Sequence, residues 1–268
     1  MEYHVKKLLI TGDDGYNSIG IRALIYLLKN NYELYIAGSK DQMSGIGGKV
    51  TMEGFSWEEG EVDGVKALVV NGTPSDAMEL ALSYFDGKKF DLVISGINMG
   101  ANLGAATFTS GTVAAALRAL GIGLCKNAIA LNWDLSYEHW MKKHNGYEDL
   151  SEITEYPGKA CVKLIEIAFA SGFWNTPLLN INLPKEKSGK ALFTRPIYDL
   201  TLAYDYSISQ NLAKKRYSYE GDRIDSPKLD GTYDTKALIN GFISITPCKF
   251  DILNEQAYDN NKEKTLEL

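Results

Sequence analysis

The sequence predicts an α/β protein built on a mostly parallel sheet with helices on both faces. Short apolar segments typical of buried strands alternate with amphipathic helical segments through the first half of the chain. Polar, glycine-containing turns follow several of the strand segments, as at 12–15 and 96–100. The chain has 268 residues, of which 45% are hydrophobic, so it is long and apolar enough to bury a substantial core.

In the first half, helical spacing of Ile21, Leu24 and Leu28 predicts a helix over 19–30. A second helix is expected to open at Thr73, which suits the N-cap, with Pro74 in the first helical position. A third helix is expected over the alanine-rich segment 112–120. Strands are predicted at 8–11, 33–38, 90–95 and 128–131, and a β excursion at 49–70 with strand segments at 50–52, 55–57 and 66–70 and a turn at 63–64.

The second half is less regular. A helix is expected over 156–173 and a strand over 178–183, and Pro184 stops that strand. Short β segments and tyrosines follow over 191–219, and a late strand over 241–247 returns to the core. We expect a catalytic domain at 1–185 and a β-rich carboxyl-terminal extension at 186–268. The tyrosine-rich part at 198–219 packs on a neighbouring subunit or folds back on its own subunit.

Composition excludes several classes of protein. The net charge of −6 and the lack of a basic block argue against a nucleic-acid polymer as the main partner. The three cysteines are odd in number and far apart, which is typical of reduced thiols and not of a disulfide framework or a zinc site. No signal peptide and no long apolar span is evident, so we expect a cytoplasmic protein with no membrane partner.

The segment around which the chain is organised is the strand 8–11 with the paired acids that follow it, Asp13 and Asp14. In an open α/β sheet, ligands bind at the carboxyl ends of the strands. Two adjacent carboxylates repel each other, and a hard divalent cation bound between them is the simplest way to offset this repulsion. The alternative is that one of the acids caps the helix beginning near Ser18 while the other faces solvent.

Three further strand ends supply oxygen-bearing side chains: Ser44 after the second strand, Asn71 after the β excursion, and Asn98 after the strand 90–95. Carboxylate, hydroxyl and amide oxygens favour Mg²⁺ or Mn²⁺. The segment 109–112 then opens a helix, where free N–H groups and the helix dipole favour an anion. A metal beside an anion-binding helix end is what hydrolysis of a phosphate ester needs, although Ser110 can also be an ordinary N-cap.

The sequence lacks the complete motifs of several other classes of nucleotide-binding proteins and hydrolases. The segment 45–50 lacks the first glycine and the final Ser or Thr of a P-loop, and Val50 stands where the dinucleotide fingerprint needs its third glycine. The chain has no nucleophile elbow, no His-Glu-x-x-His pattern, and no Asp-x-Asp after the first strand.

The motifs together resemble the SurE family, the stationary-phase survival phosphatases that act as 5′/3′-nucleotidases. The resemblance rests on 13–15, 20–21, 44–45, 71–76, 95–104 and 110–115, and continues through 180–184 and 241–247. It implies a Rossmann-like domain with a carboxyl-terminal extension used in assembly of a homodimer or homotetramer. It also implies one divalent metal, Mg²⁺ or Mn²⁺, and carried over by motif its ligands are Asp13, Asp14, Ser44 and Asn98.

On this basis we expect metal-dependent hydrolysis of nucleoside 5′- and 3′-monophosphates to nucleoside and phosphate. The expected catalytic residues are Asp13, Asp14 and Asn98, and the expected substrate-binding residues are Gly15, Asn71, Asn102, Ser110, Gly111 and Thr112. Either Asp13 and Asp14 act only as metal ligands, or one of them acts as a base or a nucleophile. The sequence does not decide between these roles. Departures from the family pattern at Gly12, Gly38, Ala105, Ala106 and Thr109 lie near the substrate pocket. The alternatives are a broader acid phosphatase or exopolyphosphatase, and a catalytically weak nucleotide-binding protein.

Overall fold

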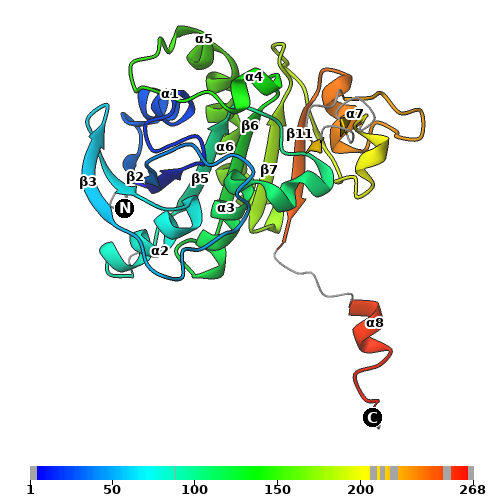
Figure 1. Ribbon diagram of the computed structural model, residues 1–268, viewed down its shortest axis with the longest axis horizontal. Coiled ribbons are helices and arrows are strands. Elements are labelled where there is room, and N and C mark those ends of the chain that lie inside the picture. The colour runs from blue at the N-terminus through cyan, green and yellow to red at the C-terminus, as the bar shows by residue number, and fades with distance from the viewer. Residues whose placement is uncertain are drawn as a thin grey trace.

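A computed structural model describes residues 5–87, 89–205, 210–211, 215–217, 223–249 and 255–264. Its centre is a sheet of nine strands in the order β3-β4-β2-β1-β5-β6-β7-β11-β8 (Figure 1). The strands are β1 Lys7–Thr11, β2 Glu33–Ser39, β3 Trp57–Val62, β4 Val65–Val70, β5 Leu92–Asn98, β6 Ala128–Trp133, β7 Leu178–Leu183, β8 Ala191–Phe193 and β11 Ile243–Cys248. The predicted α/β fold with a mostly parallel sheet is confirmed.

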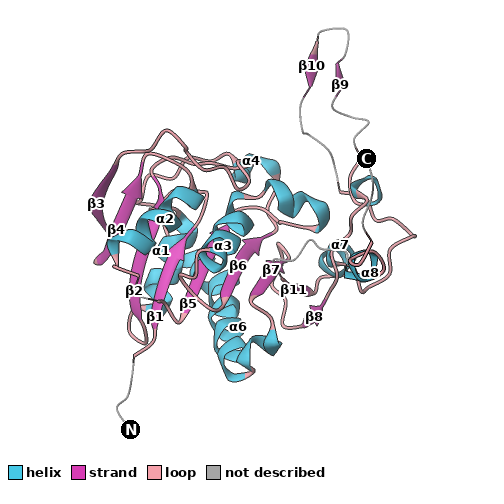
Figure 2. Ribbon diagram, turned by 90° about the horizontal axis from the view of Figure 1, so that it is seen from below, coloured by secondary structure: helices cyan, strands magenta, loops and turns pink. Residues whose placement is uncertain are grey.

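Strand direction follows from the connections. The six strands from β4 through β7 in the sheet order run parallel to one another, with registers such as Leu8 opposite both Leu34 and Leu92. The hairpin strand β3 is antiparallel to β4. The late strand β11 is antiparallel to β7 and parallel to β8, which forms the edge of the sheet (Figure 2). The order reverses at β1, where the chain continues to β2 on one side and to β5 on the other.

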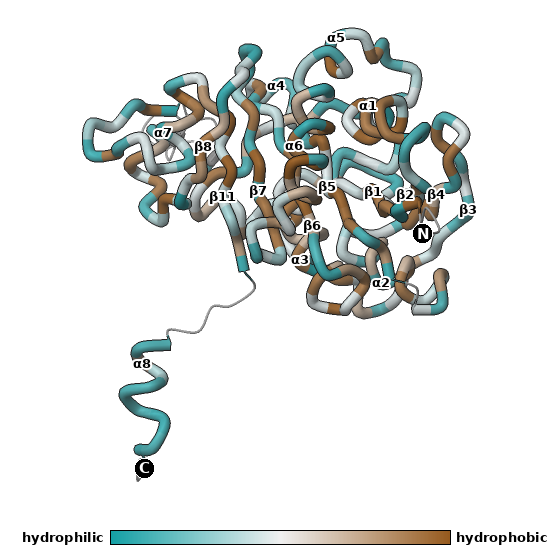
Figure 3. The backbone as a smooth tube through the Cα atoms, turned by 180° about the vertical axis from the view of Figure 1, so that it is seen from behind, coloured by the Kyte–Doolittle hydropathy of each residue, from teal (hydrophilic) through white to brown (hydrophobic). Residues whose placement is uncertain are grey.

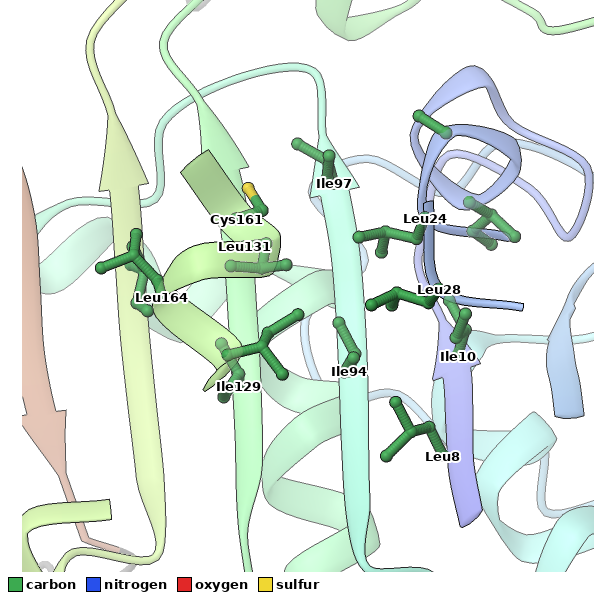
Figure 4. Packing of buried hydrophobic residues seen from close by; sticks show 14 of the residues in the cluster. Leu8, Ile10, Leu24, Leu28, Ile94, Ile97, Ile129, Leu131, Cys161 and Leu164 are labelled. Atoms are coloured by element: carbon green, nitrogen blue, oxygen red, sulfur yellow. The ribbon is translucent and has the colours of Figure 1, made fainter. Parts of the chain in front are cut away.

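Helices cover both faces of the sheet. Helices α1 (Ile19–Leu28) and α6 (Lys159–Ala170) share one core cluster with the sheet. Figure 4 shows this packing, with Leu24 and Leu164 directed toward the apolar side chains of the strands. Helices α2 (Pro74–Tyr84) and α3 (Gly111–Gly121) share a second cluster on the other face. The tube in Figure 3 shows hydrophobic residues concentrated in the central strands between these layers.

The remaining elements are short. They are the helices α4 Tyr137–Trp140, α5 Ser151–Ile153, α7 Asp234–Ile239 and α8 Glu255–Asp259, the strand pair β9 Gln210–Asn211 and β10 Arg216–Tyr217, the 3₁₀ turns Gly104–Thr109, Gly172–Asn175 and Leu200–Leu202, and the π turn Thr154–Gly158. No helix among the described residues is both long and apolar enough to span a bilayer. Parts of the tyrosine-rich segment, including 206–209 and 218–219, lie outside the described residues.

Two predicted elements are wrong in detail. The segment 50–52 is a loop, because the backbone N–H and the hydroxyl of Thr51 both bind the carboxylate of Asp76 and not a neighbouring strand. The helix predicted from 156 begins as α6 at Lys159. Tyr156 is extended at φ −153° and ψ 131°, as is favoured before a proline.

Candidate functional site

The paired acids lie where β1 ends, and both are buried. Asp13 is 4% exposed and Asp14 is 5% exposed. Ser18, and neither aspartate, caps α1, since the Ser18 hydroxyl accepts a hydrogen bond from the N–H of Ile21. The alternative in which one acid caps this helix and the other faces solvent is therefore wrong.

The N-terminus of α3 holds Asp13. Its Oδ1 accepts a hydrogen bond from the Thr112 hydroxyl, and the backbone N–H groups of Gly111 and Thr112 also donate to the carboxylate. A Cβ at Gly111 would lie 2.7 Å from the Cβ of Asp13, so this close approach requires glycine. In this structure the carboxylate of Asp13 is thus the anion at the helix end.

Asp14 lies on the other side of the same turn. Its Oδ2 accepts a hydrogen bond of 3.0 Å from the backbone N–H of Met99, which follows β5. Burial raises the pKa of both carboxyl groups, and the nearby charge of Asp13 raises the pKa of Asp14 further. Among the ion pairs of the described residues, none offsets these charges with Lys, Arg or His. The pair therefore lacks a positive partner.

Two more oxygen donors fit a cation beside this pair. Asn98 uses its Nδ2 to donate to the carbonyl of Gly100 at 2.8 Å, which leaves Oδ1 for a metal. The hydroxyl of Ser44 donates to the carbonyl of Trp140 at 3.0 Å and accepts a hydrogen bond from Nε2 of Gln42, which leaves one lone pair for a metal. No cluster of three or more His, Cys, Asp or Glu exists within the described part of the chain. An oxygen-only set with two carboxylates suits Mg²⁺ or Mn²⁺ better than zinc.

Ser110 is the N-cap of α3. Its Oγ accepts a hydrogen bond of 3.1 Å from the N–H of Val113. The ordinary N-cap interpretation of Ser110 is therefore correct as a description of its hydrogen bond. Gly15, also expected to bind substrate, takes a left-handed conformation at φ +98° directly after the paired acids, and its carbonyl accepts from the N–H of Ser18.

Two other predicted substrate residues differ in their surroundings. Asn102 belongs to a group of four asparagines linked by hydrogen bonds at the ends of β6 and β7; its partners are Asn132, Asn180 and Asn182. Asn71 is exposed, and its backbone N–H donates to the carbonyl of Ser56. Asn71 follows β4, which lies two strands away from β1 in the sheet.

Sequence reasoning missed two residues that shape the site. Trp140 of α4 packs on Gly100, where an added Cβ would lie 2.7 Å from the indole ring. Asp234, the first residue of α7, is fully buried, and its Oδ2 accepts a hydrogen bond of 2.6 Å from the N–H of Gly104. Gly104 begins the 3₁₀ turn that leads to Ser110. The two contacts join residues that are 40 and 130 positions apart in the sequence, and no local spacing indicates them.

These features define a class of protein: a Rossmann-like α/β protein with a buried, oxygen-rich acidic site at the carboxyl ends of its central strands. The family is also identified. The sequence model described as "Survival protein SurE" matches residues 8–199, and the chain belongs to the SurE family.

Relatives match over nearly the full length. The chain is 33% identical over 260 residues to a protein of Archaeoglobus fulgidus named 5′-nucleotidase SurE, covering 94% of this chain and 95% of the relative. It is 31% identical over 253 residues to a protein of the same name from Thermoanaerobacter sp., covering 92% and 93%. The crystal structure of the SurE protein from Aquifex aeolicus superposes with a TM-score of 0.72 at 26% identity and covers 96% of this chain and 98% of that one.

Proposed function

We propose that this chain is a metal-dependent phosphomonoesterase that hydrolyses nucleoside 5′- and 3′-monophosphates to nucleoside and phosphate. The observation that carries the proposal is the pair of adjacent buried carboxylates Asp13 and Asp14, for which the described residues supply no positively charged partner. Two buried like charges call for a cation. Relatives named 5′-nucleotidase SurE over more than nine-tenths of the chain support the substrate class.

The residues that would hold the metal are Asp13, Asp14, Ser44 and Asn98. When bound, a divalent ion supplies charge stabilisation to phosphoryl oxygens and lowers the pKa of a bound water. Thr112 and the α3 amides fix the carboxylate of Asp13 in place. The Met99 N–H orients Asp14 through Oδ2, which leaves Oδ1 to face the cation or a water. We assign the substrate phosphate to the space between these acids and the 110–112 turn.

The substrate-binding assignments of Gly15, Asn71, Asn102, Ser110, Gly111 and Thr112 belong to the same proposal. Gly111 and Thr112 contact the carboxylate of Asp13 at the helix end, so in this proposal they act on the substrate next to that carboxylate. Asn102 is best explained as a residue that positions the loop after β5 through the asparagine group.

We also propose that the protein works in the cytoplasm as a homodimer or homotetramer assembled through the carboxyl-terminal extension. The edge strand β8 supports this, since Phe193 is 51% exposed and packs edge-on against the half-exposed Trp174. Unprotected edge strands with exposed aromatic residues pair readily with another chain. Light scattering after size exclusion tests the assembly, and a monomer at all concentrations contradicts it.

The experiment that tests the activity is phosphate release from nucleoside 5′- and 3′-monophosphates, p-nitrophenyl phosphate and polyphosphate with Mg²⁺, Mn²⁺ or a chelator. Nucleoside monophosphates are expected to be the best substrates, with activity lost in the chelator. Equal or faster hydrolysis of the generic ester or of polyphosphate supports the broader phosphatase instead. Binding of AMP without phosphate release supports the weak nucleotide-binding alternative, to which the departures at Ala105, Ala106 and Thr109 in the turn before Ser110 point.

A further inference from the structure

A cavity is lined by Ile19 of α1, by Met99 and Trp133 near the ends of β5 and β6, and by residues of the segment that contains α4 and α5. Figure 1 shows where α1, α4 and α5 lie in the fold. Its volume of about 370 Å³ is within the size range of small-molecule sites. None of the four proposed metal ligands is among its described lining residues. The cavity is nevertheless close to the metal site, because Met99, whose N–H binds Asp14, contributes to its wall.

Part of the wall of this cavity is apolar and includes an aromatic ring. Trp133 is the last residue of β6 and Leu135 lies two positions later, and both are at most 9% exposed. Met99 and Ile153 are 4% and 1% exposed. Thioether and indole groups at such a wall pack favourably on a flat, polarisable ring.

One polar side chain in the wall has unused hydrogen-bonding capacity. The side chain of His144 is 3% exposed, and neither ring nitrogen has a hydrogen-bond partner within the described residues. Its Nδ1 lies 3.4 Å from Oε1 of Glu148 without hydrogen-bond alignment, and that oxygen accepts the N–H of Asn145 at 2.7 Å. Nε2 is not part of this contact. Burial lowers the pKa of His144, so near neutral pH the ring is uncharged and offers one donor and one acceptor.

The charges at the cavity argue against an anion. Three carboxylates line it, those of Asp149, Glu152 and Glu186, against two lysines, Lys142 and Lys185. A flat, uncharged ring with both donors and acceptors on its edge matches the aromatic wall, the neutral imidazole and the carboxylates, which accept from ring amino groups.

We propose that this cavity binds the neutral heteroaromatic base of a nucleoside and that His144 forms a hydrogen bond to its edge. The choice of a nucleoside rests on the proposed function, whose substrates and products carry such a base. The base comes from the bound substrate or from a free nucleoside, and the contact of Met99 with Asp14 connects either occupant to the catalytic turn.

The test is calorimetric titration of the intact protein with adenosine and with uridine, with and without Mn²⁺. The native protein is expected to bind the nucleosides saturably. In His144→Leu the affinity is expected to fall about tenfold or more, which corresponds to the loss of about one hydrogen bond. His144→Gln keeps a neutral donor and acceptor and is expected to bind within about threefold of the native protein. Leu135→Trp, which fills the cavity, is a second variant expected to lose binding. Tyr147→Ala is the control, because Tyr147 is 90% exposed on the same segment and does not line the cavity.

Kinetics distinguish the two sources of the base. If the base is that of the substrate, adenosine competes with AMP, and His144→Leu raises KM for AMP more than for p-nitrophenyl phosphate. If the base is that of a free nucleoside, adenosine changes kcat for p-nitrophenyl phosphate without competing with AMP. Both results support the cavity as a base-binding site. Absence of saturable binding, or equal binding by the native protein and both His144→Leu and Leu135→Trp, overturns it. Hydrolysis of nucleotides with such a negative titration refutes this inference alone, whereas nucleoside binding without any nucleotide hydrolysis refutes only the proposed function.

Discussion

Replacement of Asp14 by asparagine is expected to abolish phosphate release while making the metal-free protein more stable. Asparagine has the same shape, and its Oδ1 can still accept the Met99 N–H, which now lies 3.0 Å from Oδ2 of Asp14. The substitution therefore removes one buried charge and changes little else. In the proposed site, the negative charge of Asp14 attracts the divalent ion. Without the ion, the same buried charge destabilises the folded protein.

The size of the stability change follows from the surroundings of the carboxylate. An unpaired buried charge costs about 3–5 kcal/mol, and the Met99 hydrogen bond to a charged acceptor returns about 1–2 kcal/mol of this. We therefore expect the free energy of unfolding to rise by about 1–4 kcal/mol in a chelator. For a chain of this length that corresponds to an increase in Tm of about 2–7 °C. Turnover with metal should fall by about 10³-fold or more, since a charge directed at the reacting centre is lost.

The assay is thermal unfolding of the native protein and of Asp14→Asn in chelator and over a Mn²⁺ titration, with phosphate release measured in parallel. Mn²⁺ should raise the Tm of the native protein and leave that of the variant nearly unchanged. Asp41→Asn is a matched control at an exposed aspartate and should change neither quantity. A variant that is less stable than the native protein in chelator, or that retains full activity, would refute the reasoning about this site.

Three further predictions test the fold and the site. Gly20→Ala should prevent folding or cost about 4 kcal/mol or more, because a Cβ there would lie 1.9 Å from the carbonyl oxygen of Ile97, whereas Gly121→Ala, with nothing within 4 Å, should be neutral in urea unfolding. Burial raises the pKa of Asp234 above its usual value of 3.8, so the free energy of unfolding should fall as the pH rises from that value through the raised pKa. Asp234→Asn should flatten this fall when urea unfolding is measured as a function of pH. Removal of divalent ions should abolish hydrolysis reversibly; activity that survives exhaustive chelation contradicts the metal site.

The elements that could be predicted from the sequence are those in which the local pattern and the tertiary packing agree. The strand that ends at Thr11 and the helix opened by Thr73 are of this kind, and Thr73 and Asp76 form a reciprocal capping box in the structure. The segment at 50–52 had a plausible strand pattern, but the carboxylate of Asp76 competes for its N–H and hydroxyl groups. A bond to a residue 25 positions away decides its conformation.

The position of Asp13 and Asp14 in the candidate site could be predicted from the sequence. The hydrogen bonds that hold the surrounding loops could not. Two acids directly after a buried strand indicate that they lie at the carboxyl ends of the strands, where ligands bind. The bond from Ser44 to Trp140 joins residues 96 positions apart, and the asparagine group around Asn102 joins loops nearly as distant. Such contacts depend on how the loops fold over the strand ends, which neither periodicity nor spacing records.

The hydrogen bond between Asp234 and Gly104 has a consequence for the folding of the chain during synthesis. During synthesis the paired acids emerge first, and α7 emerges only when most of the chain has been made. Until α7 docks, the N–H of Gly104 has no carboxylate to bind, and the turn leading to α3 lacks its support from behind. A nascent or truncated chain that ends before α7 would therefore carry its acidic pair without this support for the turn that leads to α3, and the support would be completed only when α7 and the strand β11 that follows it dock.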